Sequence, residues 1–230
     1  MPVVELLTSS WLGSLLGIRH ALEPDHLAAV TTLVSGERNV AKAALLGVWW
    51  GLGHTLALLL AGTVLLGLRA EMPAAASDGF EFAVALMLVG LGVRAIMQAA
   101  RLGANGPTRT HRHGRVVHSH GGVPAHVHIG AWTLARRPLL VGAIHGLAGS
   151  GALTALVLAT LPSTAAQLAY VVLFGLGSTV SMAALSGVLG WPLARFGTHH
   201  AVGRCVLLLV GCLTTALGVV WGYPAIGRLL

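Results

Sequence analysis

Two histidines and two carboxylates fall within seven residues near the N-terminus, at His20, Glu23, Asp25 and His26, in a stretch that otherwise has the composition of a membrane-spanning helix. Each charge at the centre of such a helix costs roughly 2.5–3.5 kcal/mol, so it persists where the bundle interior pairs it, hydrates it or supplies a cation. Imidazole nitrogen and carboxylate oxygen, without thiolate, suit borderline divalent ions such as nickel, cobalt or zinc. The cluster therefore predicts a metal site inside the membrane.

The geometry of this segment depends on Pro24. In a regular helix His20, Glu23 and His26 share one ridge, and Asp25 faces another side. Pro24 has no N–H to bond the carbonyl of His20, and its ring disfavours a straight helix. A kink or short unwound turn there would bring Asp25 to the histidines and leave the His20 carbonyl free. We expect His20, Asp25 and His26 to be metal ligands; the alternative is a hydrogen-bond cluster that only holds the bundle together.

Other polar residues have two interpretations each. Glu23 is either a ligand or the partner of Arg19, which lies four residues earlier on the same face of a continuous helix. His54, in the sequence Gly-Leu-Gly-His-Thr, is a core residue or a ligand or gate, and His145 is a further candidate ligand. Neighbouring hydroxyls either support the site as a gate or bond adjacent helices: Thr55, Ser150, Ser178 and Thr179.

The composition is that of an integral membrane protein. The chain is 55% hydrophobic and 9% charged, with a mean hydropathy of +0.81. Apolar segments, each near the roughly 20 residues that cross a bilayer, lie at about 9–34, 41–68, 80–101, 138–161, 164–190 and 202–223. We therefore predict an all-α, polytopic fold with about six transmembrane helices in a single membrane domain, 1–230.

The basic residues indicate topology rather than nucleic-acid binding. The net charge is +7, and ten lysines and arginines fall in the first, third and fifth loops against two on the other side. The positive-inside rule then places those loops in the cytoplasm and both termini outside the cytoplasmic membrane.

An internal repeat divides the chain. Gly-Ile-Arg-His-Ala-Leu at 17–22 matches Gly-Ala-Ile-His-Gly-Leu at 142–147, and Gly-Leu-Gly-His-Thr at 51–55 matches Gly-Leu-Gly-Ser-Thr at 175–179. The repeats span about 9–101 and 138–223, and three helices in each force opposite orientations. Inverted repeats with polar segments at the midplane are a plan of secondary transporters. Chance similarity between glycine- and leucine-rich helices is the alternative.

The connection at about 103–135 is rich in paired histidines with glycine, proline and arginine between them: His111, His113, His118, His120, His126 and His128. Such a tract is typical of weak, exchangeable metal binding. It would buffer or sense metal in the cytoplasm, or else it is a basic loop that only fixes topology.

The motif His-x-x-x-x-Asp-His at 20–26 resembles the signature of the nickel/cobalt transporter family (NiCoT/NicO), and Gly-His-Thr at 53–55 and Ile-His-Gly-Leu-Ala-Gly-Ser-Gly at 144–151 resemble further parts of it. The resemblance implies that His20, Asp25 and His26 bind the metal, with His54 in support. It covers nearly all the apolar segments, although long family members have eight helices with the motif in the second. The family contains importers and exporters, so it implies no direction.

These observations predict a secondary transporter of Ni²⁺ or Co²⁺ with a midplane site on the broken first helix. We expect no enzyme activity, no permanently bound cofactor and no nucleic-acid partner; the partners would be the metal ion, the bilayer and a cytosolic metal-handling protein. Two alternatives from other classes are a membrane metal sensor and a haem-binding oxidoreductase subunit that uses His54 and His145 as axial ligands. Zinc and iron remain alternatives to nickel and cobalt, because intrinsic affinities follow the metal series.

Overall fold

The computed structural model describes residues 2–35, 37, 39–68, 72–104, 110–113, 116–119, 126–129, 132–148, 161, 163–196 and 200–229. Its described helices are α1 (Pro2–His20), α2 (Pro24–Val34), α3 (Val40–Leu68), α4 (Ala74–Ala104), α5 (Arg136–Leu147), α7 (Thr164–Phe196) and α8 (His200–Leu229). Among these, α3, α4, α7 and α8 are long and apolar enough to cross a membrane. The protein is therefore a helical membrane protein. The first predicted span is divided between α1 and α2, and the described part of the fourth is α5.

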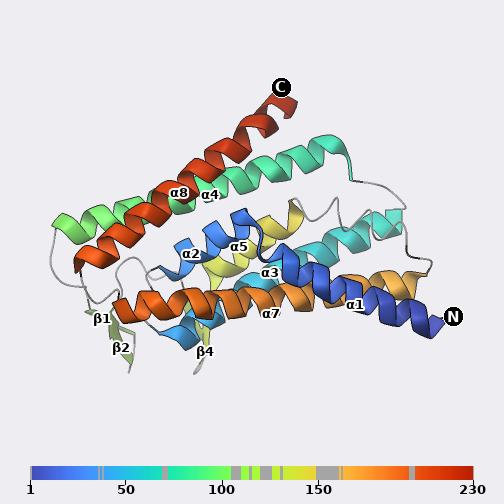
Figure 1. Ribbon diagram of the computed structural model, residues 1–230, viewed down its shortest axis with the longest axis horizontal. Coiled ribbons are helices and arrows are strands. Elements are labelled where there is room, and N and C mark those ends of the chain that lie inside the picture. The colour runs from blue at the N-terminus through green and yellow to red at the C-terminus, as the bar shows by residue number, and fades with distance from the viewer. Residues whose placement is uncertain are drawn as a thin grey trace.

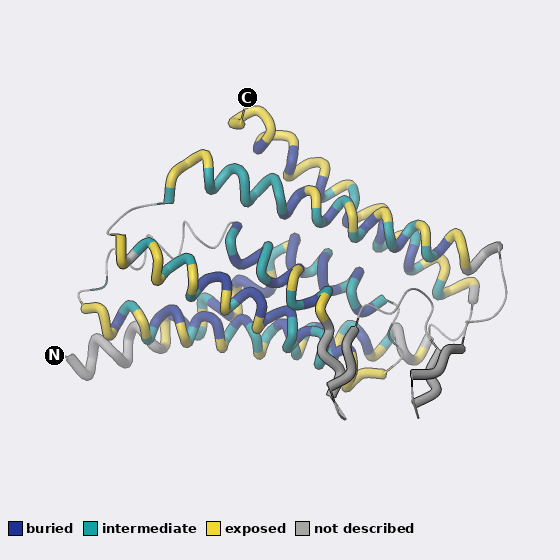
Figure 2. Tube along the Cα trace, turned by 180° about the vertical axis from the view of Figure 1, so that it is seen from behind, coloured by how far each residue is buried: buried dark blue, intermediate teal, exposed yellow. Residues whose placement is uncertain are grey.

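The helices form three layers (Figure 1). Helices α4 and α8 pack along one another on one side, and α1, α3 and α7 form the other side, with α1 and α3 both packed against α7. The short helices α2 and α5 lie between these layers. Buried residues gather on α2 and α5 and on the inner faces of the long helices (Figure 2). The middle layer is thus the shielded part of the molecule.

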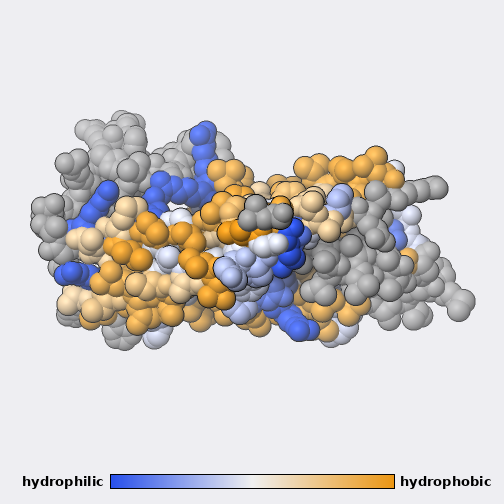
Figure 3. All heavy atoms as spheres, turned by 90° about the horizontal axis from the view of Figure 1, so that it is seen from above, coloured by the Kyte–Doolittle hydropathy of each residue, from blue (hydrophilic) through white to orange (hydrophobic). Residues whose placement is uncertain are grey.

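The outer surface is suited to lipid. Large apolar side chains spaced four residues apart along α3 are exposed, namely Leu56, Leu60 and Val64. Residues four apart lie on one helix face, so this face of α3 presents a continuous apolar stripe. Seen from the α4 and α8 side, most of the described surface is apolar, interrupted by a hydrophilic patch (Figure 3).

Glycines allow the helices to approach closely. A Cβ at Gly51 of α3 would lie 2.6 Å from the Cα of Thr179 in α7, and a Cβ at Gly175 of α7 would collide with Thr55 of α3. In the same way, a Cβ at Gly53 would collide with the carbonyl of a residue in α5. Small residues at such contacts are how membrane helices bring their backbones together.

The first apolar segment breaks where Pro24 predicted a break. Helix α1 ends at His20, and α2 begins at Pro24, a position where proline is well tolerated because the missing N–H would be unpaired anyway. The backbone N–H of Glu23 donates to the carbonyl of His20 at 3.1 Å, and the N–H of Leu27 donates to the carbonyl of Glu23 at 3.0 Å. The expectation of a free His20 carbonyl was therefore wrong, because the tight turn supplies its own donor.

Part of the histidine-rich connection forms two β-hairpins. β1 (Thr110–His113) pairs with β2 (Val116–Ser119), and β3 (His126–Ile129) pairs with β4 (Trp132–Ala135), both antiparallel. The alternation of histidine with valine, threonine and isoleucine favours strands. Among the described residues, these two hairpins are the regular elements that are not helical. The side chains of this connection, and His120 altogether, lie outside the described residues.

Candidate metal centre

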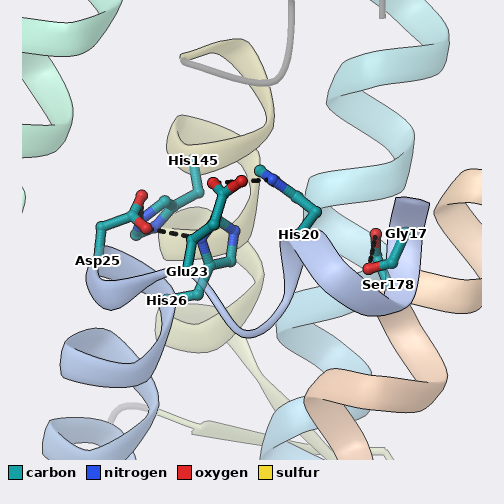
Figure 4. Close-up of polar contacts among 7 residues, drawn as sticks. All are labelled: Gly17, His20, Glu23, Asp25, His26, His145 and Ser178. Atoms are coloured by element: carbon teal, nitrogen blue, oxygen red, sulfur yellow. Dashed lines mark hydrogen bonds and ion pairs between the residues drawn. The ribbon is translucent and has the colours of Figure 1, made fainter. Parts of the chain in front are cut away.

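Four histidines and one aspartate meet where α1 ends, α2 begins, and α3 and α5 pass alongside. Figure 4 shows His20, Asp25, His26 and His145 of this group. Their exposed fractions are 0% for His54, 1% for His26, 2% for His145, 5% for His20 and 9% for Asp25. We call these five residues the buried cluster. The break at Pro24 is what places His20 and Asp25 on the same side, since they belong to different helices.

Asp25 joins two of the histidines. One carboxylate oxygen lies 3.0 Å from Nδ1 of His26, and the other lies 3.2 Å from Nε2 of His145. A carboxylate on one ring nitrogen fixes the orientation of an imidazole and leaves the other nitrogen for a ligand. The N-terminal and C-terminal halves of the chain are therefore linked through Asp25 at the centre of the bundle.

Glu23 pairs with His20, and its carboxylate lies 3.0 Å from Nδ1 of the ring. The side chain of Glu23 is 42% exposed. Because α1 ends at His20, Arg19 and Glu23 do not share a continuous helix face, and among the described residues no ion pair joins them. Arg19 is exposed. The interpretation of Glu23 as the partner of Arg19 was therefore wrong.

Several ring nitrogens of the buried cluster have no hydrogen-bond partner among the described residues: Nε2 of His20, Nε2 of His26, both nitrogens of His54 and Nδ1 of His145. A buried polar group without a partner typically costs about 1–3 kcal/mol. Buried polar side chains are otherwise almost always paired. A cation that takes several of these nitrogens as ligands would remove that cost, so the donor set fits a divalent metal ion.

Trp50 supports the cluster and was not among the predicted residues. It is 1% exposed, and its ring lies 5.4 Å from that of His26 in a stacked arrangement and 5.7 Å from that of His145 edge-on. A Cβ at Gly142 would collide with the carbonyl of Trp50, so this glycine lets α5 approach α3. The available signal was the spacing of Trp50, four residues before His54 and so on the same helix face.

A cavity of about 330 Å³ reaches the buried cluster. Its described wall comprises His20, Glu23, Pro24, Asp25, His26, Glu81, Val84, His145, Ala148 and Trp221. Glu81 of α4 also forms an ion pair with Arg228 of α8. The cavity thus leads from a charged region between α4 and α8 to the histidines.

The predicted hydroxyls bond neighbouring helices. Ser178 donates to the carbonyl of Gly17 at 3.1 Å, a contact drawn in Figure 4. Thr55 of α3 donates to the carbonyl of Gly175 in α7 at 3.0 Å and lies 3.2 Å from the hydroxyl of Thr179, which donates to the same carbonyl within α7 at 2.8 Å. Their contacts fix α1 and α3 against α7. Ser150 lies outside the described residues.

The fold and the buried cluster define a class: a helical membrane protein with a histidine and aspartate centre suited to a divalent metal ion. The chain is 32% identical to the urease accessory protein UreH of Bacillus sp. (strain TB-90), over 97% of this chain and 94% of that protein. The chain belongs to the UreH family.

Two plant proteins are also similar. The Arabidopsis thaliana chloroplast proteins FOR GROWTH AND FERTILITY 2 and 1 are 28% and 30% identical over 81% and 80% of this chain, which spans 48% and 50% of their lengths. No family model and no solved structure matches the chain.

Proposed function

We propose that this protein is a secondary transporter that carries Ni²⁺ or Co²⁺ across the cytoplasmic membrane. The observation that carries the proposal is the set of buried, unpartnered imidazole nitrogens beside Asp25 in the middle of an apolar helical bundle. Imidazole suits nickel, copper, zinc and iron, and a single carboxylate adds charge without selecting for hard ions. Ionisable residues inside membrane segments mark ion pathways by default.

Two resemblances support the choice of metal. The signature at 20–26 resembles that of the nickel/cobalt transporter family, and the relative UreH carries a name that makes it accessory to urease, which is a nickel-related role. In our proposal His20, Asp25 and His26 are the core ligands, with His54 and His145 completing the site. Glu23 is an outer carboxylate that holds His20 and faces the cavity.

The transport mechanism is proposed to use two inverted repeats that rock about the site. Reciprocal contacts support this arrangement. A Cβ at Gly51 would meet Thr179, while a Cβ at the matching Gly175 would meet the matching Thr55.

A second pair of contacts has the same reciprocity. A Cβ at Gly53 would meet the carbonyl of Leu139, while one at the matching Gly177 would meet that of Ser14. Ser14 and Leu139 each precede the glycine of their own repeat motif by three residues. Exchange of the two halves thus preserves both contacts, as a two-fold axis through the bundle requires.

The remaining properties follow from the carrier proposal. The metal is cargo, and we propose that the protein has neither enzymatic activity nor a resident cofactor. Both termini lie outside, and the histidine-rich connection lies in the cytoplasm, where it buffers metal or meets a metal-handling protein. Ligands must lose their protons to bind metal, so we propose that protons are the coupling ions.

The test is the metal content of cells. Total nickel and cobalt are measured by elemental mass spectrometry at low external metal in cells that express the chain, the variant His26→Ala or the control Leu60→Ala on the exposed face of α3. We expect a change in cellular nickel or cobalt that requires His26 and persists in the control; accumulation indicates import and depletion export. Equal contents in wild-type and His26→Ala cells at equal expression, with zinc and iron also unchanged, would refute a carrier.

A further inference from the structure

The ligand atoms of the buried cluster fall into two groups. His20, His26 and His54 place one ring nitrogen each within 4.8 Å of one another, and Asp25, His26 and His145 place their ligand atoms within the same limit. His26 belongs to both groups. The cluster therefore offers two adjoining positions for an ion, which we call the inner group (His20, His26 and His54) and the outer group (Asp25, His26 and His145).

The two groups differ in their access to the cavity. All three members of the outer group line the cavity, as do His20 and His26, whereas His54, the remaining member of the inner group, is absent from the described wall. His54 is 0% exposed, and the rings of His20 and His26 lie 5.1 Å and 5.6 Å from it. An ion that arrives through the cavity can therefore meet the complete outer group, but it reaches His54 only by passing the rings of His20 and His26.

His26 is built to serve both groups. Its Nδ1 lies 3.0 Å from Asp25, while its Nε2 is buried and without a partner among the described residues. The ring centroids of His145 and His20 lie 4.5 Å and 4.4 Å from that of His26. Because both neighbouring rings lie this close to His26, an ion needs only a short movement to pass from one group to the other. Trp50 stacks on the ring of His26 and restricts the rotation of that ring.

The two groups also differ in chemistry. The outer group contains a carboxylate, which compensates part of the charge of a dication that leaves water. The inner group consists of three imidazoles and carries no negative charge when they are neutral. Nitrogen ligands favour nickel, cobalt, copper and zinc, whereas magnesium, calcium and manganese prefer oxygen. The outer group is thus suited to capture a dication, and the inner group is suited to select it.

We propose that the buried cluster is two metal sites in series, an outer capture site and an inner selection site that share His26, and that one ion passes between them during transport. This inference rests on the proposed carrier function. Because two dications this close would repel strongly and both would need His26, the sites hold one ion at a time. His54 is then the residue that determines specificity, although it is absent from the His-x-x-x-x-Asp-His motif.

The test uses the full-length protein purified in lipid nanodiscs and titrated with NiCl₂. Calorimetry gives the stoichiometry and dissociation constant, and nickel X-ray absorption counts the imidazoles around the ion. His54→Phe disables the inner site and His145→Phe the outer site, each with an aromatic ring that limits the loss of packing; His26→Phe disables both. Where one of these is not monodisperse, His20→Phe replaces His54→Phe and Asp25→Asn replaces His145→Phe. Nickel flux is measured with the same variants in proteoliposomes.

We expect one ion per chain in the wild type and in both single-site variants, with dissociation constants within about tenfold of one another. The ion is expected to have two imidazoles in His54→Phe and three in His145→Phe, while His26→Phe weakens binding at least a hundredfold. Flux falls at least tenfold in every variant. If His54→Phe and His145→Phe each weaken binding as much as His26→Phe does, or show the same imidazole count, the cluster is a single site. If binding follows the expected pattern but the wild-type protein shows no nickel flux, the two metal sites are supported and the proposed carrier function is refuted.

Discussion

Gly51→Ala is expected to disable transport although it adds only one methyl group to a helix. The new Cβ would lie 2.6 Å from the Cα of Thr179 and 2.8 Å from its Cβ, where ordinary contact begins at 3.4 Å. Helices α3 and α7 must therefore separate by about 0.8 Å, the difference between 3.4 and 2.6 Å. His54 follows Gly51 by three residues on α3 and is carried with it.

A displacement of this size matters because metal–ligand distances tolerate only about 0.2 Å. A misplacement of about 1 Å in a reactive centre can cost on the order of a hundredfold in rate. Overpacking lowers the free energy of unfolding by about 1–3 kcal/mol, and the better helix propensity of alanine raises it by about 1 kcal/mol. We therefore expect a folded protein with a free energy of unfolding lower by at most about 2 kcal/mol and a nickel flux lower by at least tenfold.

Gly62→Ala is the matched control on the same helix, since a Cβ there has no atom within 4 Å. It is expected to keep wild-type flux and to gain up to about 1 kcal/mol of stability from helix propensity. Both variants are compared by nickel flux in proteoliposomes and by thermal unfolding in detergent. Wild-type flux in Gly51→Ala would refute the argument that close packing of α3 against α7 positions His54.

Three further predictions concern residues outside the buried cluster. Ser178→Ala removes the interhelical hydrogen bond to Gly17 and is expected to cost about 0.6 and at most about 1.7 kcal/mol in unfolding titrations. Arg228→Ala breaks ion pairs with two α4 carboxylates, Glu81 among them, but Arg228 is exposed, so we expect the temperature of thermal unfolding to stay close to that of the wild type. A clear drop in that temperature would show that these ion pairs hold α4 against α8. Deletion of 103–135, replaced by a short glycine and serine linker, is expected to change the rate of metal flux without abolishing it, whereas complete loss would favour the sensor interpretation.

The sequence predicted the break in the first apolar segment and the polar residues that meet beside it. Pro24 identified where the first apolar segment bends, and the repeat of the His20 motif identified His145 as a partner from the other half. The structure places both His26 and His145 against Asp25. The break and this meeting of residues could be predicted because they depend on local backbone chemistry and on residue types that are costly in a membrane. That these residues bind metal stays a prediction.

Other features depended on contacts that spacing alone does not determine. One of the two interpretations of Glu23 paired it with Arg19 on a continuous helix, but the tight turn after His20 instead turns the Glu23 carboxylate to the ring of that histidine. Trp50 was missed because an apolar helix gives little indication of which face meets another helix; its contact with His26 depends on the packing of α3 against α2 and α5. The hairpins of the histidine-rich connection were missed because each strand has only four residues, and so short a stretch of sequence predicts a strand weakly.

The most direct test of the carrier is nickel flux into proteoliposomes that contain only the purified protein and lipid. Wild-type protein and His26→Phe are reconstituted at equal density, and Ni²⁺ entry is followed with a trapped fluorescent chelator while a proton gradient of either direction is imposed. The account predicts wild-type flux well above that of protein-free vesicles, a response to the proton gradient, and no flux above background for His26→Phe. Equal flux in wild-type and variant vesicles, or none in either with the protein shown to be folded, would contradict it.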